Sequence, residues 1–323
     1  MSSALDVLGR YALPAASLQP LGNHGGFSGA RLWRVEAGTA SFCLRAWPPD
    51  DPTPERLRWL HDLMAAARAA GLTFVPQLVP IGGATFTHHA GRLWELTAWL
   101  PGRADFHEHP GPGRLRAACA ALARLHSAWA GLFAARGTCP AVARRLDRAG
   151  EWLTLVSAGW RPHLDKGDPV APWAEAAWRL LAVWAERVGV LLAPWTGRPC
   201  ALHPCLCDVW HDHVLFEGDA VSGILDYGSV KVDHPAADLA RLLGSLVGDD
   251  AAGWAAGLDA YGSLRPLSPD EQALARALDR TGVILAAANW LKWLYRDARV
   301  FDDRLRIAGR LAGLVRRLQA WPI

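Results

Sequence analysis

The chain has 323 residues, of which 51% are hydrophobic and 20% charged, so it can bury a substantial core. The net charge of +3 is small and the arginines are scattered among acids, which argues against nucleic-acid binding. No stretch reaches the about 18 uncharged apolar residues that span a bilayer, no signal-peptide pattern opens the chain, and the six cysteines lack paired zinc-ligand spacing. We therefore predict a cytoplasmic protein with reduced thiols, without nucleic-acid or membrane partners. Its oligomeric state is left open.

The first hundred residues are predicted to form strands around one helix. Ala37-Gly38-Thr39 separates two strands as a hairpin connection does. Thr53 followed by Pro54 is typical of a helix start, and Gly71 of a helix end. Pro101-Gly102 then breaks the pattern. The predicted strands span residues 31–36, 41–47, 77–81 and 93–99.

The remainder is predicted to be mainly helical, because apolar residues recur there every three or four positions. Residues 137–172 are less regular and are interpreted as an insertion or flap, and Val214 to Asp226 is expected to form a small hairpin. These elements predict an α+β fold of two lobes, divided into residues 1–99 and 100–323. The predicted helices span residues 114–133, 173–192, 270–294 and 303–318.

The segment His203 to Leu239 carries the candidate chemistry. Asp208 precedes the first strand of the predicted hairpin and Asp226 follows the second, so the hairpin should bring the two carboxylates together. Convergent carboxylates suit metal–phosphate chemistry, in which one positions a hydroxyl and the other holds a divalent cation. Asp residues beside a hairpin also serve simply as turn formers, and the residues alone leave both interpretations open.

The same segment resembles the aminoglycoside phosphotransferase and choline kinase family. That family has a catalytic loop H-G-D-x-x-x-x-N-V-L, then I-D-F/W-G and D-P-x-x-D-L-A. In this chain Leu206-Cys207-Asp208, His213-Val214-Leu215, Leu225 to Gly228 and Asp233 to Ala240 occupy the corresponding places. The resemblance implies a protein-kinase-like fold, with a small β-rich N-terminal nucleotide-binding lobe and a larger helical C-terminal lobe. It also implies an ATP-dependent phosphotransferase that acts on a small-molecule hydroxyl.

The resemblance assigns the catalytic roles. Asp208 would orient the substrate hydroxyl and accept its proton, and Asp226 would hold Mg²⁺ on the phosphates of ATP. Asp238 would cap backbone N–H groups of the catalytic loop. His126, in the segment ALARLHSAW, matches the end of a helix that usually reads L-x-x-L-H.

The resemblance also implies nucleotide contacts. A Gly-rich loop with Gly25, Gly26 and Ser28 would cover the phosphates, because backbone N–H groups in such a loop approach phosphate closely. Backbone groups around Leu96 and Ala98 would contact adenine. Taken alone, the Gly-rich loop is equally a plain hairpin turn.

One departure from the family pattern concerns the phosphate-binding cation. Arg45 stands where the family has a strand lysine. It keeps the charge, and its guanidinium can bind phosphate or carboxylate in a bidentate way that an ammonium cannot. The lysine's helix partner would be an acid; we expect Glu55 in that role, with Asp62 as the runner-up. A solvated helix face explains both acids equally well.

Two further departures lie in the catalytic loop. Leu206 replaces a histidine that mainly supports the loop, and His213 replaces a metal-binding Asn. Imidazole is a poor ligand for Mg²⁺ and a better one for Mn²⁺ or Zn²⁺. His213 can therefore bind Mn²⁺ in place of Mg²⁺, act in catalysis by a hydrogen bond to Asp208 or phosphate, or mark a site that has lost catalysis. In an extended loop His211 would point the same way as His213.

The sequence thus predicts a kinase, with a pseudokinase that binds nucleotide or ligand without turnover as the alternative. A purely structural protein is the third possibility. The C-terminal helices are rich in arginine, which favours a neutral or anionic metabolite over a polycationic aminoglycoside, although a solvated helix face accounts for them equally. These arginines are Arg296, Arg299, Arg304, Arg306 and Arg310.

Overall fold

The computed structural model describes residues 2–11, 13, 16–22, 29–165, 167–301 and 303–322. The chain divides into two compact units. Unit 1 comprises Met1–Leu132 and Asp208–Val230, and unit 2 comprises Phe133–Cys207 and Lys231–Ile323. The segment that carries both candidate carboxylates therefore belongs to unit 1. The predicted boundary after residue 99 was drawn between a nucleotide-binding lobe and a substrate-binding lobe, and it stays a prediction.

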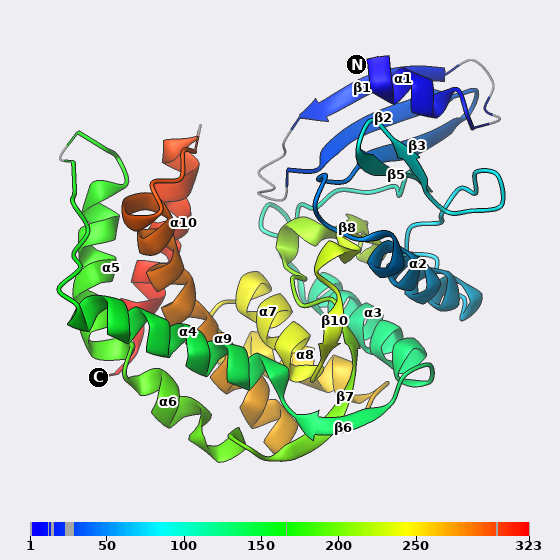
Figure 1. Ribbon diagram of the computed structural model, residues 1–323. Coiled ribbons are helices and arrows are strands. Elements are labelled where there is room, and N and C mark those ends of the chain that lie inside the picture. Colours follow the sequence, from blue (N-terminus) through cyan, green and yellow to red (C-terminus); the bar gives the residue numbers. More distant parts are fainter. Residues whose placement is uncertain are drawn as a thin grey trace. The chain divides into compact units, whose positions relative to one another are not determined.

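Unit 1 is built on a five-stranded antiparallel sheet with the order β1-β2-β3-β5-β4 (Figure 1). The strands predicted at 31–36, 41–47 and 93–99 are confirmed as β2, β3 and β5, whereas β1, β4 and the N-terminal helix α1 were not predicted. The bounds are α1 (Ser2–Leu8), β1 (Ala16–Gly22), β2 (Arg31–Ala37), β3 (Ala40–Ala46), β4 (Thr87–His89) and β5 (Arg92–Ala98).

The strand predicted at 77–81 is wrong. Residues 77–79 make only an isolated bridge, between Leu78 and Thr97, flanked by two backbone hydrogen bonds to β5. Pro76 and Pro80 stand on either side of this segment. Since proline has no N–H to donate, the ladder cannot extend in either direction.

The alternation of side chains gives the sheet two chemically different faces. On β3, Leu44 and Ala46 join the buried apolar cluster that also contains Val7 of α1. Neighbouring side chains on a strand point to opposite faces, so Arg45 and its cross-strand partner Glu95 project from the other side. The Arg45–Glu95 ion pair therefore lies on the face of the sheet away from α1.

Helix α2 (Pro54–Ala69) begins as predicted. The Thr53 hydroxyl oxygen accepts a hydrogen bond from the Arg56 N–H at 3.2 Å, and Pro54 occupies the first turn. The buried face of the helix combines Leu57, Leu60 and Leu63 with one histidine, His61. A polar residue on this apolar face needs hydrogen-bond partners, which His61 finds in Glu95 of β5 and in Thr85.

The hairpin predicted from Val214 to Asp226 is confirmed as β8 (Val214–Glu217) and β9 (Ala220–Ile224), which pair antiparallel. It is attached to the rest of unit 1 by backbone hydrogen bonds, including one from the Ile224 N–H to the Phe74 carbonyl oxygen at 2.9 Å. Helix α3 (Pro112–Ala130) contacts both β9 and α2. The hairpin therefore rests on a scaffold within its own unit.

Unit 2 is mainly helical, with one three-stranded antiparallel sheet of order β10-β7-β6. Helices α4, α5, α7 and α10 all contact α9, the longest helix in the described part of unit 2 (Figure 1). The bounds are β6 (Ala135–Thr138), α4 (Pro140–Ser157), α5 (Ala171–Trp184), α6 (Arg187–Leu192), β7 (Pro199–Cys205), β10 (Lys231–Asp233), α7 (Ala236–Leu246), α8 (Ala251–Gly262), α9 (Pro269–Leu291) and α10 (Arg304–Ala320).

Two expectations for these helices need correction. The flap expected at 137–172 contains helix α4, because Pro140 stands in its first turn, where proline starts a helix rather than breaks it. The single helix expected at 173–192 is two helices, α5 and α6, with Ala185 and Glu186 between them. Helix α9 continues into a π-helical turn, Lys292–Arg296. The α+β class predicted from the sequence is confirmed.

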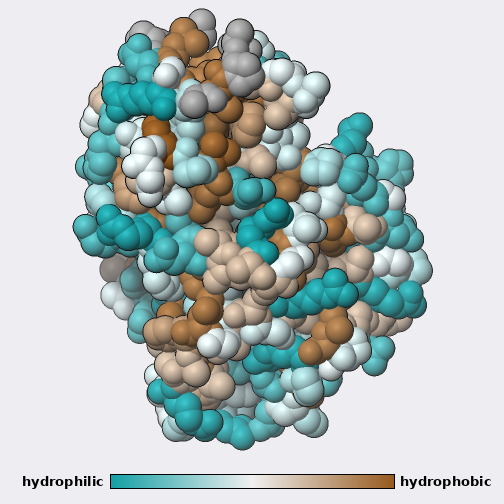
Figure 2. All heavy atoms as spheres, turned by 90° about the vertical axis from the view of Figure 1, so that its right-hand side faces the viewer, coloured by the Kyte–Doolittle hydropathy of each residue, from teal (hydrophilic) through white to brown (hydrophobic). Residues whose placement is uncertain are grey.

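Apolar and polar residues are interspersed on the face of the molecule drawn in Figure 2. The large exposed apolar side chains include Val190, Val300 and Leu305. Across the described ranges, none of the helices has both the length and the apolar character needed to cross a membrane. All six cysteines are free thiols.

Candidate active site

The two candidate carboxylates meet within unit 1. The Leu225 N–H donates to the His213 carbonyl oxygen at 2.8 Å, which holds the two ends of the hairpin together. As a result, one ligand atom from each of Asp208, His213 and Asp226 lies within 4.8 Å of the other two. The juxtaposition expected from the sequence is therefore present. Two carboxylates this close can share a divalent cation or flank a metal-bound phosphate.

Asp226 sits on a turn with an uncommon backbone. Its φ and ψ of 61° and 71° lie in the left-handed region, which among L-residues Asn and Asp tolerate best. Its carboxylate is 41% exposed, and the 3₁₀ turn Tyr227–Ser229 follows directly. A Cβ at Gly228 would stand 3.1 Å from the Trp47 ring, so this glycine allows the indole to approach the turn. Backbone strain of this kind is typical of functional positions.

His213 is hydrogen-bonded at both ring nitrogens. The indole Nε1–H of Trp210 donates to His213 Nε2 at 3.0 Å, and His213 Nδ1 lies 2.8 Å from the Asp208 carbonyl oxygen. Because an indole N–H can only donate, Nε2 is the acceptor and Nδ1 carries the hydrogen. His213 in this state holds the backbone at Asp208 and has its lone pair engaged by Trp210. Of the roles left open by the sequence, the hydrogen bond to Asp208 has direct geometric support.

The loop around His213 does not have the extended backbone that would point His211 and His213 the same way. His211–His213 forms a 3₁₀ turn, closed by a hydrogen bond from the His213 N–H to the Trp210 carbonyl oxygen at 2.8 Å. The ring of His211 instead packs edge-on against His107, with their centroids 4.3 Å apart. In a helical turn, residues two apart do not share a face, so His211 is not placed beside His213 as a second ligand.

Arg45 is the cation of the site and lies between two carboxylates. Its Nε is 3.7 Å from Glu95 Oε1, and its Nη1 is 3.6 Å from Asp226 Oδ1. Its guanidinium carbon lies 4.6 Å from the centre of the Trp47 ring, a cation–π distance. Burial alone would lower the pKa of Arg45, but Glu95 and Asp226 outweigh it and raise that pKa. Arg45 therefore keeps its charge beside the acidic cluster.

The partner predicted for Arg45 is not the one that the structure provides. Glu55 is exposed in the first turn of α2, where hydrogen bonds from its own backbone N–H and from Thr53 lower its pKa. It serves the helix start, and Asp62 is exposed as well. Glu95 takes the place because β3 pairs with β5 and sets residues 45 and 95 directly opposite each other.

Sequence reasoning missed Glu95 and His61. The signal for Glu95 is an acid inside the apolar strand segment Leu93–Leu96, since a charged side chain buried there requires partners. His61 is a polar residue on the apolar face of α2, which likewise indicates that its side chain requires buried partners. Neither signal says which partner is used, because that depends on strand order and helix placement.

Only some of the predicted nucleotide contacts fall on residues that the structure describes. Gly25, Gly26 and Ser28 lie outside the described residues. Leu96 and Ala98 are part of β5, where the Leu96 carbonyl oxygen accepts from the Val79 N–H and the Ala98 N–H donates to the Gln77 carbonyl oxygen, both at 2.8 Å. An adenine ring could therefore use only the other backbone groups of these two residues.

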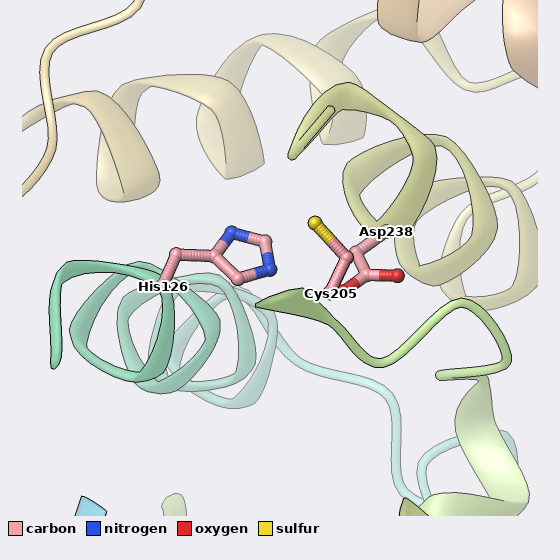
Figure 3. Close-up of side chains that lie close together, drawn as sticks. All are labelled: His126, Cys205 and Asp238. Atoms are coloured by element: carbon pink, nitrogen blue, oxygen red, sulfur yellow. The ribbon is translucent and has the colours of Figure 1, made fainter. Parts of the chain in front are cut away.

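Unit 2 holds the two residues that immediately precede Asp208. The backbone N–H groups of Leu206 and Cys207 donate to the two carboxylate oxygens of Asp238, each at 2.6 Å, which confirms the capping predicted for Asp238. Burial raises the pKa of Asp238 to about 7 although these hydrogen bonds lower it. Leu206 is fully buried, so a hydrophobic residue fits the position. Figure 3 shows the origin of Asp238 on α7, of Cys205 on β7 and of His126 on α3.

Comparisons with known proteins identify the family of the chain. The sequence profile described as "phosphotransferase enzyme family" matches residues 21–278. Homoserine kinase of Afipia carboxidovorans is 29% identical over 250 residues, which cover 73% of this chain and 69% of that protein.

Two solved structures show the same fold over nearly all of the chain. The structure of spectinomycin phosphotransferase with ADP and spectinomycin has a TM-score of 0.69 at 11% identity, and that of a microcompartment-associated aminopropanol kinase has a TM-score of 0.67 at 16% identity. In both comparisons the match covers 98% of this chain and 96% of the other.

Proposed function

We propose, from the premise that this chain belongs to the phosphotransferase enzyme family and is a small-molecule kinase, that Asp208, Asp226 and Arg45 form its phosphoryl-transfer site. The observation that carries the proposal is the convergence of Asp208 and Asp226 to within 4.8 Å, with Arg45 3.6 Å from Asp226. Two acids and one cation at this spacing match the needs of phosphoryl transfer, which depends on positioning and charge stabilisation.

Each residue has a defined part in the proposed reaction. The substrate hydroxyl oxygen forms a bond to the γ-phosphorus of ATP, the bond from that phosphorus to the β–γ bridging oxygen breaks, and ADP leaves. Asp208 orients the hydroxyl and accepts its proton. Arg45 neutralises phosphate charge.

The donor set fits a bound Mg²⁺. Carboxylate oxygens of Asp226, with Asp208 nearby, are the ligand type that Mg²⁺ prefers, and the lone pair of His213 Nε2 is engaged by Trp210. We therefore assign the metal to Asp226 and give His213 the task of holding the Asp208 backbone; direct metal binding by His213, which would favour Mn²⁺, requires the Trp210 hydrogen bond to open. When bound, the cation neutralises charge on the β- and γ-phosphates.

The proposed acceptor is a small amino alcohol. The names of two similar proteins, a homoserine kinase and an aminopropanol kinase, each denote a small molecule with one hydroxyl and one amino group. Aminopropanol carries one positive charge at neutral pH and homoserine is zwitterionic, so this class meets the expectation of a neutral or anionic metabolite only in the case of homoserine.

Thermal unfolding with ATP, in Mg²⁺, in Mn²⁺ and without metal, tests the nucleotide site. ATP at 100 times its Kd should stabilise the protein by about 2.7 kcal/mol. Asp226→Asn should remove the metal-dependent part of the shift. ATP stabilisation that is indifferent to metal would favour the pseudokinase alternative, and the absence of stabilisation under all three conditions would contradict nucleotide binding.

Phosphorylation of homoserine and of aminopropanol, followed as ADP release, tests turnover. We expect Asp208→Asn to lower kcat by about 10²–10⁴-fold, the usual contribution of a general base, while ATP binding persists. An unchanged kcat in Asp208→Asn would show that this carboxylate is not the base.

A further inference from the structure

Glu95 is a buried carboxylate with two hydrogen-bond donors on one oxygen and a guanidinium beside the other. It is 7% exposed on strand β5. Its Oε2 accepts hydrogen bonds from His61 Nε2 at 2.7 Å and from Trp47 Nε1 at 3.0 Å, while Oε1 faces the Arg45 guanidinium at 3.7 Å. The two N–H donors thus fix the carboxylate plane so that the remaining oxygen points at Arg45.

His61 is itself held at both ring nitrogens. The residue is 2% exposed on α2, and its Nδ1 lies 2.7 Å from the Thr85 hydroxyl oxygen. Its ring also packs edge-on against Phe86, with centroids 5.8 Å apart. Because a carboxylate only accepts, Nε2 must carry the hydrogen of the bond to Glu95. A buried imidazole with both nitrogens engaged has one orientation, and that orientation serves Glu95.

Arg45 is the residue that Glu95 holds in place. Glu95 holds its Nε side, Trp47 stacks below its plane at 4.6 Å, and its Nη1 reaches towards Asp226 at 3.6 Å. Trp47 therefore contacts both members of the pair, through its N–H and through its ring. Helix α2 is linked to the reacting centre by the series His61, Glu95, Arg45.

We propose that His61 and Glu95 are positioning residues that orient Arg45 towards the phosphates of ATP. The strand cation of this chain is a long, forked guanidinium, which selects phosphate geometry only when its plane is fixed. Here the acid that fixes the guanidinium plane is Glu95 of strand β5. Helix α2 contributes the imidazole N–H of His61 where an acid was expected. This inference rests on the proposed function, since it concerns the same phosphate site.

Three variants of α2 separate positioning from stability. His61→Leu replaces the imidazole with an apolar side chain of moderate size and removes the donor to Glu95, and His61→Gln restores a donor. Asp62→Asn, exposed on the same helix, is the matched control. For each variant, the Kd values of Mg²⁺–ATP and of AMP are measured by calorimetry, together with Tm in the absence of nucleotide.

The readout is discrimination between ATP and AMP, because a role in stability alone would not change it. We expect His61→Leu to lose about 10-fold in ATP affinity relative to AMP, by analogy with the loss of a residue that orients a metal ligand. His61→Gln should recover most of this discrimination, and Asp62→Asn should match the wild type.

The proposal is overturned if folded His61→Leu discriminates ATP from AMP as well as the wild type does. Should His61→Leu fail to fold, Glu95→Gln provides the test: it keeps the shape of the side chain but removes the charge that holds Arg45, and unchanged discrimination would again overturn the proposal. Failure of the proposed function is distinguishable, since the wild type itself would then not bind ATP.

Discussion

Two arginines of this chain lie between two carboxylates at almost the same depth, one in each unit. Arg45, Glu95 and Asp226 have side chains 19%, 9% and 41% exposed, and Arg317, Asp279 and Asp249 have side chains 18%, 10% and 40% exposed. The geometries differ. Arg317 bonds to both oxygens of each Asp at 2.6–3.3 Å, whereas Arg45 stays 3.6–3.7 Å from its two acids.

The short distances suit the Arg317 cluster to stabilising the fold, and the longer distances suit the Arg45 cluster to binding a ligand. The donors of Arg317 meet carboxylate oxygens at hydrogen-bond distance, and a Cβ at Gly244 would lie 1.9 Å from Asp279 Oδ1, so α7 carries a glycine where this carboxylate packs. Arg45 is held by charge and by the Trp47 ring at distances beyond normal hydrogen bonds. A phosphate can therefore form short hydrogen bonds to Arg45 without breaking equally short ones within the protein.

The largest expected effect on stability follows from Arg317→Met. The substitution leaves Asp279, which is 10% exposed, with an uncompensated charge, and breaking such a pair costs about 3–5 kcal/mol. Urea denaturation measures the loss. Arg316→Met, on the exposed side of α10, should stay within about 0.5 kcal/mol of the wild type. Equal effects of the two variants would remove the distinction between the two arginine clusters.

Arg45→Met should affect ATP binding more than stability. Glu95 keeps its hydrogen bonds from His61 and Trp47, so the loss of stability should be smaller than in Arg317→Met. Affinity for Mg²⁺–ATP, however, should fall about 10- to 100-fold, because a hydrogen bond to a charged group contributes about 1.5–3 kcal/mol. Calorimetric titration checks this, and a variant that binds ATP normally would show that Arg45, like Arg317, is only structural.

The smallest effect concerns pH. Burial raises the pKa of Glu95, but the hydrogen bond from His61 and the charge of Arg45 outweigh it and hold that pKa below its ordinary 4.5. The ionised group therefore stabilises the fold above about pH 4.5 and loses this contribution as the pH falls through the lowered pKa. Wild type should exceed Glu95→Gln by about 1 kcal/mol at pH 7, the difference between charged and neutral hydrogen bonds, and the gap should close in acid.

The pH prediction is checked by denaturation of both proteins at pH 7 and in steps below pH 4.5. A gap between wild type and Glu95→Gln that widened in acid would contradict the sign worked out for Glu95. A gap that did not depend on pH would show that the carboxylate contributes by its shape alone.

Local patterns in the sequence were sufficient for part of the scaffold and for the acidic pair. The alternation in β2 and β3, the Thr53 cap and the Val214 to Asp226 hairpin are all set by neighbours in the chain, and so is the approach of Asp208 to Asp226. The strand predicted at 77–81 was wrong for a local reason, because prolines stand on both sides of residues 77–79.

Only the tertiary structure decided what holds Arg45. The choice of Glu95 over Glu55 follows from the pairing of β3 with β5, and the contribution of His61 follows from the packing of α2 on that sheet. Periodicity says which face a side chain occupies, but not which strand becomes its neighbour, because strand order is chosen by the packing of the whole unit. The sequence by itself thus predicted β2, β3, β5, the start of α2 and the hairpin that brings the two carboxylates together. The fold determined the network that orients the cation beside them.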